Sequence, residues 1–471
     1  MGSPDVWYDG PAGPYSIRVL VRPPRVVPGL ADIVVRVRGG AEQVLVAPAR
    51  WDTGDQGTPA PDVAKRVRGD TELFSAQLWL MARGSYRIVV SIQGQAGPGS
   101  IVVPVTATAT ERLRMPWLMG GILLGALAFL CVGLLTAVGA AVRESVLPPG
   151  EAPSAERIRR ARAAMAGAGL IITLLLVSGW RWWGAVDAEH RARLDRMWKA
   201  DATVLNLARG ERALRFTITD SLWLMGGNRA VRSPIIPDHG KLMHMFLVRE
   251  DQAGFAHVHP ITLDSINFIV RLPALPAGRY TVYADLVHES GGTHTLIART
   301  ELNDGPATPA APVVPDLDPD DASWSGAPGL SLTTATSTLV DGSSMRWTGP
   351  MQIVAGEEMD LRIAVTDAAG APAALEPYLG MPGHMVIQRQ DASVFVHLHP
   401  LGTISPAAQR ALALGPAQLP PHEGAHLALQ GGSIVFPYAF PKPGRYRVWA
   451  QVRHKEQVLT GVFDLEVTAS H

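Results

Sequence analysis

The stretch GMPGHMVIQRQDASVFVHLHP, residues 380–400, decides how the rest of the chain is interpreted. β-Branched and other apolar residues fill its two halves, and turn formers separate them, which predicts a hairpin of strands at 384–389 and 394–399. Successive side chains of a strand point to opposite faces, and facing Cβ atoms lie about 5 Å apart. One face of this hairpin then carries three histidines: His384, His397 and His399.

The same stretch occurs once more, earlier in the chain. Residues 240–260, GKLMHMFLVREDQAGFAHVHP, align with 380–400 without a gap and share nine of 21 residues. A second block, AGRYTVYADLVH at 277–288, corresponds to PGRYRVWAQVRH at 443–454 with six identities in 12. Such a duplication predicts two copies of one module. A fainter echo without histidine, GSYRIVVSI at 84–92, predicts a third, N-terminal module.

The duplicated blocks define candidate metal ligands. In the first copy the same register places three histidines on one face: His244, His257 and His259. The GRYxVxAxxxH strand ends in a further histidine in each copy, and if it neighbours the hairpin each module presents four imidazoles. The candidate ligands are therefore His244, His257, His259 and His288 in one module, and His384, His397, His399 and His454 in the other.

Imidazole suits Cu(II), Zn(II) and Ni(II), and thioethers near the histidines would favour copper. Met245 and Met385, however, point to the opposite face in this register, which predicts core packing. The alternative is that no ion binds and the histidines are structural, with hydrogen bonds to loop carbonyls. Four other histidines have no counterpart in the other copy and are weaker candidates: His239, His294, His422 and His426.

Composition excludes several classes of protein. With 42 basic and 42 acidic residues among 471, the chain lacks the basic excess of a nucleic-acid-binding protein. Its one cysteine, Cys131, lies in an apolar run, so neither a disulfide nor a cysteine metal cluster can form within the chain. Nucleophile-elbow, P-loop and HExxH motifs are absent, and we expect a protein that is not an enzyme.

Two apolar segments predict a transmembrane hairpin, with helices at 115–142 and 163–183. The connecting loop, 143–162, contains five arginines, which favours the cytoplasm, and tryptophans flank the opposite ends. We therefore expect a protein of the bacterial inner membrane with both tails in the periplasm. Residues 1–14 lack the apolar core of a signal peptide, so either the export signal is missing from this start or the topology is inverted.

These observations predict a mainly β chain of three β-sandwich modules joined by the helical hairpin. The expected parts are a module at 1–112, the hairpin at 113–184, a histidine-bearing module at 185–302, a proline-rich linker at 303–325 and a second histidine-bearing module at 326–471. The last module contains an insertion after Leu401, in which a short helix at 405–414, capped by Ser405, is expected.

Three motifs resemble a known group of bacterial domains. They are DHGKLMHMF (238–246), the pair FAHVHP (255–260) and FVHLHP (395–400), and FPKPGRYRVWA (440–450). Over residues 200–470 the chain resembles the periplasmic YtkA-like and FixH-like modules. The resemblance implies immunoglobulin-like sandwiches, copper as the ion, and work in copper storage, delivery or resistance, with a membrane metal transporter or oxidase as partner. It equally allows a scaffold for assembly of a copper oxidase.

Overall fold

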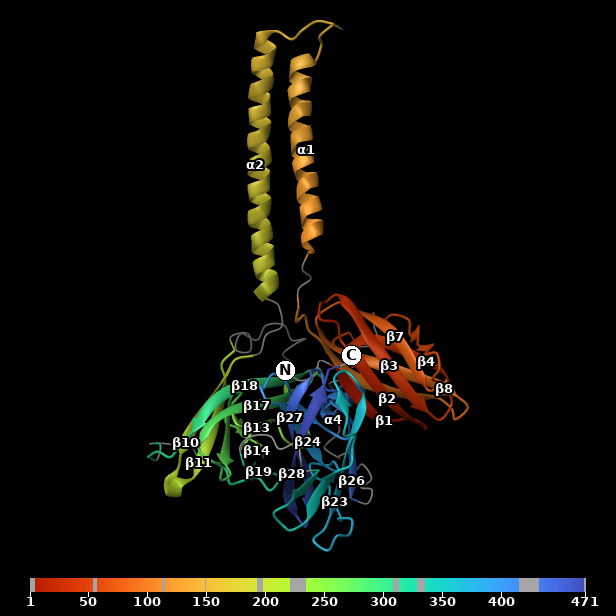
Figure 1. Ribbon diagram of the computed structural model, residues 1–471, viewed down its shortest axis with the longest axis vertical. Helices are drawn as coiled ribbons and strands as arrows, with labels where there is room; N and C mark the ends of the chain where they lie inside the picture. Colours follow the sequence, from red (N-terminus) through yellow and green to blue (C-terminus); the bar gives the residue numbers. More distant parts are fainter. Residues whose placement is uncertain are drawn as a thin grey trace. The chain divides into compact units, whose positions relative to one another are not determined.

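The protein forms two compact units, Met1–Thr108 with Arg196–His471, and Ala109–Asp195. The first consists of β-sandwiches and the second of two helices (Figure 1), as a computed structural model shows. The structure describes residues 5–53, 57–111, 115–148, 150–192, 198–220, 234–306, 308, 313–327, 335–414 and 432–469. The predicted fold class, mainly β with a helical hairpin between β-modules, is confirmed.

The N-terminal module is a sandwich of two antiparallel sheets. One sheet has the order β1 (Val6–Ala12), β2 (Tyr15–Arg22), β3 (Gly29–Arg38), β7 (Leu73–Leu80) and β6 (Lys65–Arg66). The other has the order β5 (Asp62–Val63), β4 (Ala41–Arg50), β8 (Gly84–Gly94) and β9 (Gly99–Ala107). Alternate residues of β2, β3 and β8 are buried, as expected of strands with one face on a core.

The second module also has two sheets. The outer sheet runs β10 (Ala200–Asn206), β11 (Arg212–Ile218), β16 (Asn267–Leu272) and β15 (Ile261–Thr262), with the single turn η1 (Ala208–Gly210) between β10 and β11. The inner sheet runs β12 (Ile235–Ile236), β17 (Gly278–His288), β13 (His244–Arg249), β14 (Gly254–Val258) and β19 (Ala322–Ser325), and β18 (Thr293–Leu302) pairs with β17. The end of the predicted linker, β19, is thus an edge strand of this module.

The third module repeats the plan. Its outer sheet runs β20 (Thr336–Thr338), β21 (Ser344–Trp347), β23 (Met359–Thr366) and β26 (Ser433–Tyr438). Its inner sheet runs β22 (Ile353–Val354), β28 (Gln457–Thr468), β27 (Gly444–His454), β24 (His384–Arg389) and β25 (Phe395–Leu398). The insertion forms α4 (Pro406–Leu414), and the Ala408 amide donates to Ser405 Oγ at 3.1 Å, so the predicted capped helix is confirmed.

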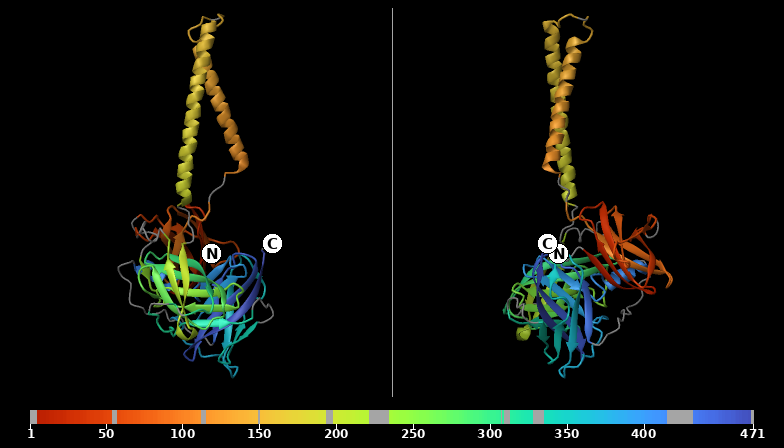
Figure 2. Two further views of the ribbon diagram at one scale, coloured as in Figure 1. Left: turned by 90° about the vertical axis from the view of Figure 1, so that its left-hand side faces the viewer. Right: turned by 45° about the vertical axis from the view of Figure 1, so that its right-hand side comes forward.

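The inner sheets of the second and third modules are buried on both faces. One face of each packs on its own outer sheet, where Met245 and Met385 lie in the cores, as predicted. The other faces pack on each other through an apolar cluster of Phe246, Val248, Phe255, Tyr283, Val386, Phe395 and Trp449. Figure 2 shows the two modules, green and blue, side by side. Burial on both faces explains why β13 and β24 are nearly continuous apolar runs.

The contact between these modules repeats itself about an approximate two-fold axis. Tyr283 stacks on Phe395 with ring centroids 3.7 Å apart and planes inclined by 2°. Phe255 stacks on Trp449 at 4.8 Å and 10°. In the sequence alignment Tyr283 corresponds to Trp449 and Phe255 to Phe395, so the same pair is formed twice. The duplicated modules therefore meet as the subunits of an isologous dimer do.

The second unit consists of α1 (Trp117–Glu144) and α2 (Ala155–Ala192). Both contain an apolar window with 0% of its residues buried, and both are long enough to cross a membrane. They run antiparallel from a short connection (Figure 2), and a Cβ on Gly139 would lie 2.5 Å from Met165 Sδ, so the helices touch there. Helix α2 begins before the predicted position, and Arg157 to Arg162 belong to its first turns rather than to the loop.

Candidate metal centre

Strand pairing places the histidines as the hairpin register predicted. Phe246 pairs with His257 in the second module, and Val386 pairs with His397 in the third. Because facing residues share a face of the sheet, His244 and His257 point to the same side, and so do His384 and His397. In both modules this is the side that faces the other module.

The first histidine group comes entirely from the second module. His244, His257 and His259 each offer a ring nitrogen, and these nitrogens all lie within 4.8 Å of one another. Nδ1 of His244 lies 3.1 Å from Nε2 of His257. All three side chains are buried. An ion among them would replace the hydrogen bond between His244 and His257.

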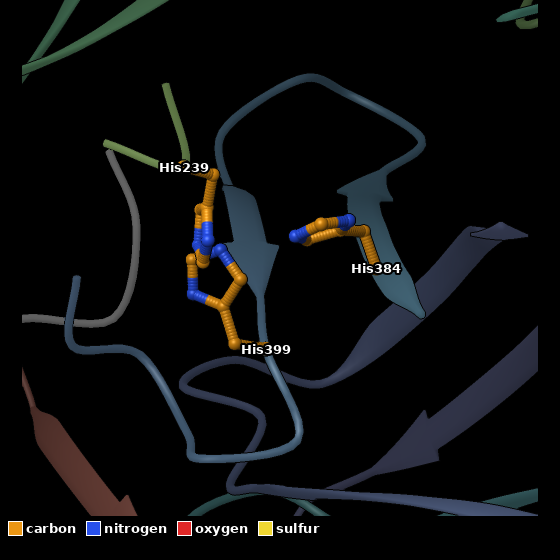
Figure 3. Close-up of side chains that lie close together, drawn as sticks. All are labelled: His239, His384 and His399. Carbon is orange, nitrogen blue, oxygen red and sulfur yellow. The ribbon is translucent and has the colours of Figure 1, made fainter. Parts of the chain in front are cut away.

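The second group contains histidines of both modules. His239, His384 and His399 offer ring nitrogens within 4.8 Å of one another, and Figure 3 shows the ring of His384 pointing toward the rings of His239 and His399. Neither ring nitrogen of His384 has a hydrogen-bond partner within the described part of the chain, although both are buried. A buried polar atom without a partner costs free energy, and a bound ion would supply that partner.

The turn before β13 carries His239 into this group. His239 has a positive φ of 52°, and Leu379, its counterpart before β24, has a φ of 51°. Both turns close with a backbone bridge, Asp238 to Lys241 and Tyr378 to Met381. The duplicated turn is thus conserved in shape between the modules, while only one copy bears a histidine.

Ring-to-ring distances show that the two groups form one cluster. The centroid of His397 lies 5.4 Å from that of His244 and 5.3 Å from that of His384. The rings of His244 and His384 are 6.5 Å apart, and those of His239 and His244 are 6.0 Å apart. We call this set the seven-histidine cluster; its members are His239, His244, His257, His259, His384, His397 and His399.

Polar side chains lie beside Nδ1 of three of these rings. Asp321 Oδ1 lies 3.0 Å from Nδ1 of His259, and Gln451 Oε1 lies 2.9 Å from Nδ1 of His257, with the Tyr378 hydroxyl at 3.2 Å from the same atom. Asp285 Oδ2 lies 3.4 Å from Nδ1 of His397. A partner on Nδ1 that accepts its proton leaves the lone pair on Nε2, which is the metal-binding tautomer.

Burial keeps five histidines of the cluster neutral. It lowers the pKa of His244 to about 3, and the neighbouring His397 adds to the effect. Burial likewise holds the pKa values of four others well below the usual value: His257, His259, His384 and His399. Neutral imidazole is the form that binds metal ions, so these five histidines are in that form across the physiological pH range.

Carboxylates near His259 also form an ion-pair network with Lys241. Asp318 and Asp321 lie with His259 in a further group of close donor atoms. Lys241 Nζ contacts Asp318 at 2.6 Å and Asp320 at 3.3 Å. The lysine thus already supplies the positive charge that a metal ion would bring to these carboxylates. Burial raises the pKa of Asp321 to about 7. The histidine groups are for this reason the better candidates for an ion.

His288 and His454 lie away from the cluster, which corrects the expected grouping of four imidazoles per module. The GRYxVxAxxxH strand does neighbour the hairpin, but His244 pairs with Asp285 and His384 with Gln451. His288 and His454 follow three residues later, an odd number, and so point to the opposite face. His288 lies 5.0 Å from the ring of His294, and Nδ1 of His454 lies 2.9 Å from the Ala374 carbonyl oxygen.

Several residues of the centre were not among the predicted ligands. His239 ranked low because it has no counterpart in the other copy, and Asp321 lies in what was interpreted as a linker. Asp285, Gln451 and Tyr378 carried no signal in a single sequence. The weaker candidates His422 and His426 lie outside the described residues.

Comparison with known protein families gives a match for the C-terminal part of the chain. A family model described as a domain of unknown function, DUF8832, matches residues 337–469, which is most of the third module. No curated protein matches the chain.

Among solved structures, the chain is similar to a tetra-tandem repeat from the extending region of a large adhesion protein, at 9% identity over 94% of this chain and 71% of that one, with a TM-score of 0.16. It is similar to a putative membrane anchored protein from Corynebacterium diphtheriae at 9% identity, over 99% and 96%, with a TM-score of 0.15. Alpha-2-macroglobulin from Escherichia coli matches at 9% identity and a TM-score of 0.19, over 100% of this chain but 24% of that one.

Proposed function

We propose that this protein is a membrane-anchored, non-enzymatic metal-binding protein that handles copper at the periplasmic face of a bacterial inner membrane. The single observation that carries the proposal is the seven-histidine cluster. It contains two groups of three histidines, and within each group the three ring nitrogens lie within 4.8 Å of one another. Storage, delivery and resistance are the forms of copper handling that such a site serves.

The donor set supports an ion that prefers imidazole. The cluster offers nitrogen ligands, which suit Cu(II), Zn(II) and Ni(II). Met245 and Met385 lie in the sandwich cores instead of the cluster. The resemblance to YtkA-like and FixH-like modules favours copper among these ions, and a membrane metal transporter or oxidase as the partner. Two apolar helices would anchor the chain in the membrane.

A scaffold with structural histidines is the alternative, and contacts with backbone carbonyls favour it for two of the candidate histidines. His454 Nδ1 is satisfied by the Ala374 carbonyl, and His244 Nε2 lies 3.3 Å from the Asp238 carbonyl. A structural histidine is expected to have such partners. His384, buried and without a hydrogen-bond partner among the described residues, is the counterexample and favours metal binding.

The test is metal titration of the full chain in detergent, with Cu(II), with Cu(I) under reducing conditions, and with Zn(II) and Ni(II). We expect saturable binding that is lost in a His257→Ala/His259→Ala variant and in a His397→Ala/His399→Ala variant. His294→Ala is the matched control, since this histidine lies outside the cluster beside Trp198, and it should bind as the natural chain does. If no ion binds saturably, the scaffold function replaces this proposal.

A further inference from the structure

We propose that the seven-histidine cluster is a dinuclear centre, in which two transition-metal ions lie side by side across the contact between the second and third modules. This inference rests on the proposed metal binding and adds the number and spacing of the ions. It differs from two independent sites, one per module, which the duplication alone would predict.

The first argument for two ions is that the cluster contains two complete sets of donors that share no residue. His244, His257 and His259 form one set, and His239, His384 and His399 form the other. Three imidazoles are enough to hold one ion and leave a further coordination position open. The two sets can therefore be filled at the same time.

The spacing of the rings carries the second step. Within the sets, centroid distances run from 4.7 Å (His257 to His259) to 5.5 Å (His239 to His384). Between the sets, His239 and His244 are 6.0 Å apart, and His244 and His384 are 6.5 Å apart. The sets are thus almost as close to each other as their own members are. Two ions held here would lie within reach of one bridging ligand, as in two-metal sites with about 3.5–4 Å between ions.

His397 supports the pairing of the two sets. Its ring lies 5.4 Å from His244 of the first set and 4.5 Å from His399 of the second. Nδ1 faces Asp285 at 3.4 Å, and Nε2 is buried without a hydrogen-bond partner among the described residues. The geometry gives His397 the place of a seventh ligand between the ions.

The last argument concerns the charge that two buried metal ions would bring. Neutral imidazoles add no negative charge, and buried cations need compensation. Carboxylates of Asp285 and Asp321 contact cluster histidines, and Asp238 Oδ1 lies 3.8 Å from Nε2 of His239. Three carboxylates surround the cluster, one for each of His239, His259 and His397. A small bridging anion such as hydroxide would supply the remaining charge for two divalent ions.

The experiment loads the full chain in detergent with Cu(II) and measures bound copper per chain together with copper–copper scattering in X-ray absorption, which reads the spacing in either oxidation state. We expect two copper ions per chain with a copper–copper distance of about 3.5–4 Å. Single replacements, His259→Ala and His399→Ala, should each leave one ion and abolish the copper–copper signal. His294→Ala should leave both ions and the signal unchanged.

The outcomes separate this inference from the proposed function. One ion per chain, or two ions without copper–copper scattering, would overturn the dinuclear centre and leave metal binding in place. Absence of any bound ion would overturn both. Because the unaltered chain alone decides between these results, a variant that fails to fold does not leave the question open.

Discussion

At the scale of single residues, the centre depends on which nitrogen of each ring is held by the protein. Nδ1 of His257 is hydrogen-bonded to Gln451 and Nδ1 of His259 to Asp321, and Asp285 Oδ2 lies 3.4 Å from Nδ1 of His397. In His257 and His259 the lone pair then lies on Nε2, so these hydrogen bonds fix both the ring orientation and the tautomer. The partners on Nδ1 should therefore affect metal affinity although they never touch the ion.

Replacing Asp321 by asparagine tests this role. Asp321→Asn keeps the size of the side chain but removes the carboxylate that faces His259, so the affinity for copper should fall by about 10–100-fold. Competition with a chromophoric chelator measures the change. Asp316→Asn is the control, since the side chain of Asp316 is fully exposed and lies 3.6 Å from Arg271. Equal affinities in the two variants would contradict the role of Asp321.

The metal-free protein should lose stability as the pH falls. Burial lowers the pKa of His244 to about 3 and those of four further cluster histidines well below the ordinary value. Above pH of about 6.5 these histidines are neutral in the folded and unfolded states, and they cause no pH dependence. Below it the unfolded state takes up protons first, which costs about 1.4 kcal/mol of stability per histidine and pH unit.

Thermal unfolding of the chelated chain at pH 7.5 and 5.0 measures this effect. Asp321, whose pKa is raised to about 7 by burial, acts in the opposite direction, but with one proton against five histidines. In a His384→Gln variant, the number of protons taken up on unfolding should fall by about one, so that the stability depends less steeply on pH. Equal unfolding temperatures at the two pH values would show that the histidines are not buried in neutral form.

The sequence predicted the positions of those histidines whose direction is set by the alternation of side chains along a strand. It did not predict the residues that reach the cluster through tertiary contacts. The grouping of His244, His257 and His259 follows from the register, because side chains alternate with a period of two. His239 reaches the cluster by a turn before its strand, and Asp321 by a segment that pairs as an edge strand of the second module. Neither position has a periodic signal that a sequence could display.

At the scale of elements, the inner sheets differ from ordinary sandwich sheets because both faces are buried. β13 and β24 contribute to their own cores and to the contact between modules at once. The sequence showed continuous apolar runs at these strands, but such runs do not reveal what covers the second face. For this reason the duplication predicted two separate sites, whereas the modules place their histidines together.

Shortening Phe395 tests the link between this contact and the site. Phe395→Ala removes the ring stacked on Tyr283 and should cost about 3–5 kcal/mol of stability. Copper affinity should fall as well, because the two modules no longer hold His244 and His384 near each other. Phe436→Ala is the matched control: this ring is equally buried, but in the core of the third module.

Both variants should unfold at lower urea concentration than the natural chain, and chelator competition under folded conditions should separate them. Only Phe395→Ala is expected to bind copper more weakly. If the two variants bound copper with equal affinity, the contact between modules would not determine the geometry of the site.

Helix α4 connects the same site to the rest of the β-unit. The Ala407 amide donates to Asp238 Oδ1 at 3.2 Å, directly before His239, and Gln409 Nε2 donates to the Val102 carbonyl of the N-terminal module at 3.2 Å. The Asp9 amide donates to the Leu401 carbonyl at 2.9 Å, two residues after His399. The insertion of the third module and the first strand of the chain therefore hold both loops that carry His239 and His399.

At the scale of the whole molecule, duplication explains why the seven-histidine cluster lies between the second and third modules. Two copies that meet through equivalent surfaces bring equivalent residues to the axis. His257 of the second module contacts Gln451 of the third, and the equivalent His397 of the third module contacts Asp285 of the second. The copies then diverged, since one carries Asp285 where the other carries Gln451, and one carries His239 where the other carries Leu379. Divergence of this kind produces two unequal halves, and we expect the two sets to differ in affinity.

If α1 and α2 cross a membrane, the direction in which they do so decides the compartment of the seven-histidine cluster. Arg143, Arg157, Arg159, Arg160 and Arg162 lie at the connected ends of α1 and α2. Positive charge near short loops favours the cytoplasm. Both tails, and with them the cluster, would then lie in the periplasm, where copper is handled without the competition of cytosolic thiols.

Labelling of single cysteines tests this topology. In a Cys131→Ser background, Gln457→Cys introduces a thiol at an exposed position of β28, and Ser154→Cys introduces one in the exposed connection before α2. In intact spheroplasts a membrane-impermeant maleimide should modify Gln457→Cys and not Ser154→Cys, and lysis should make both reactive. The reverse pattern would place the cluster in the cytoplasm, and because glutathione and thiol proteins compete for copper there, zinc would become the ion to test first.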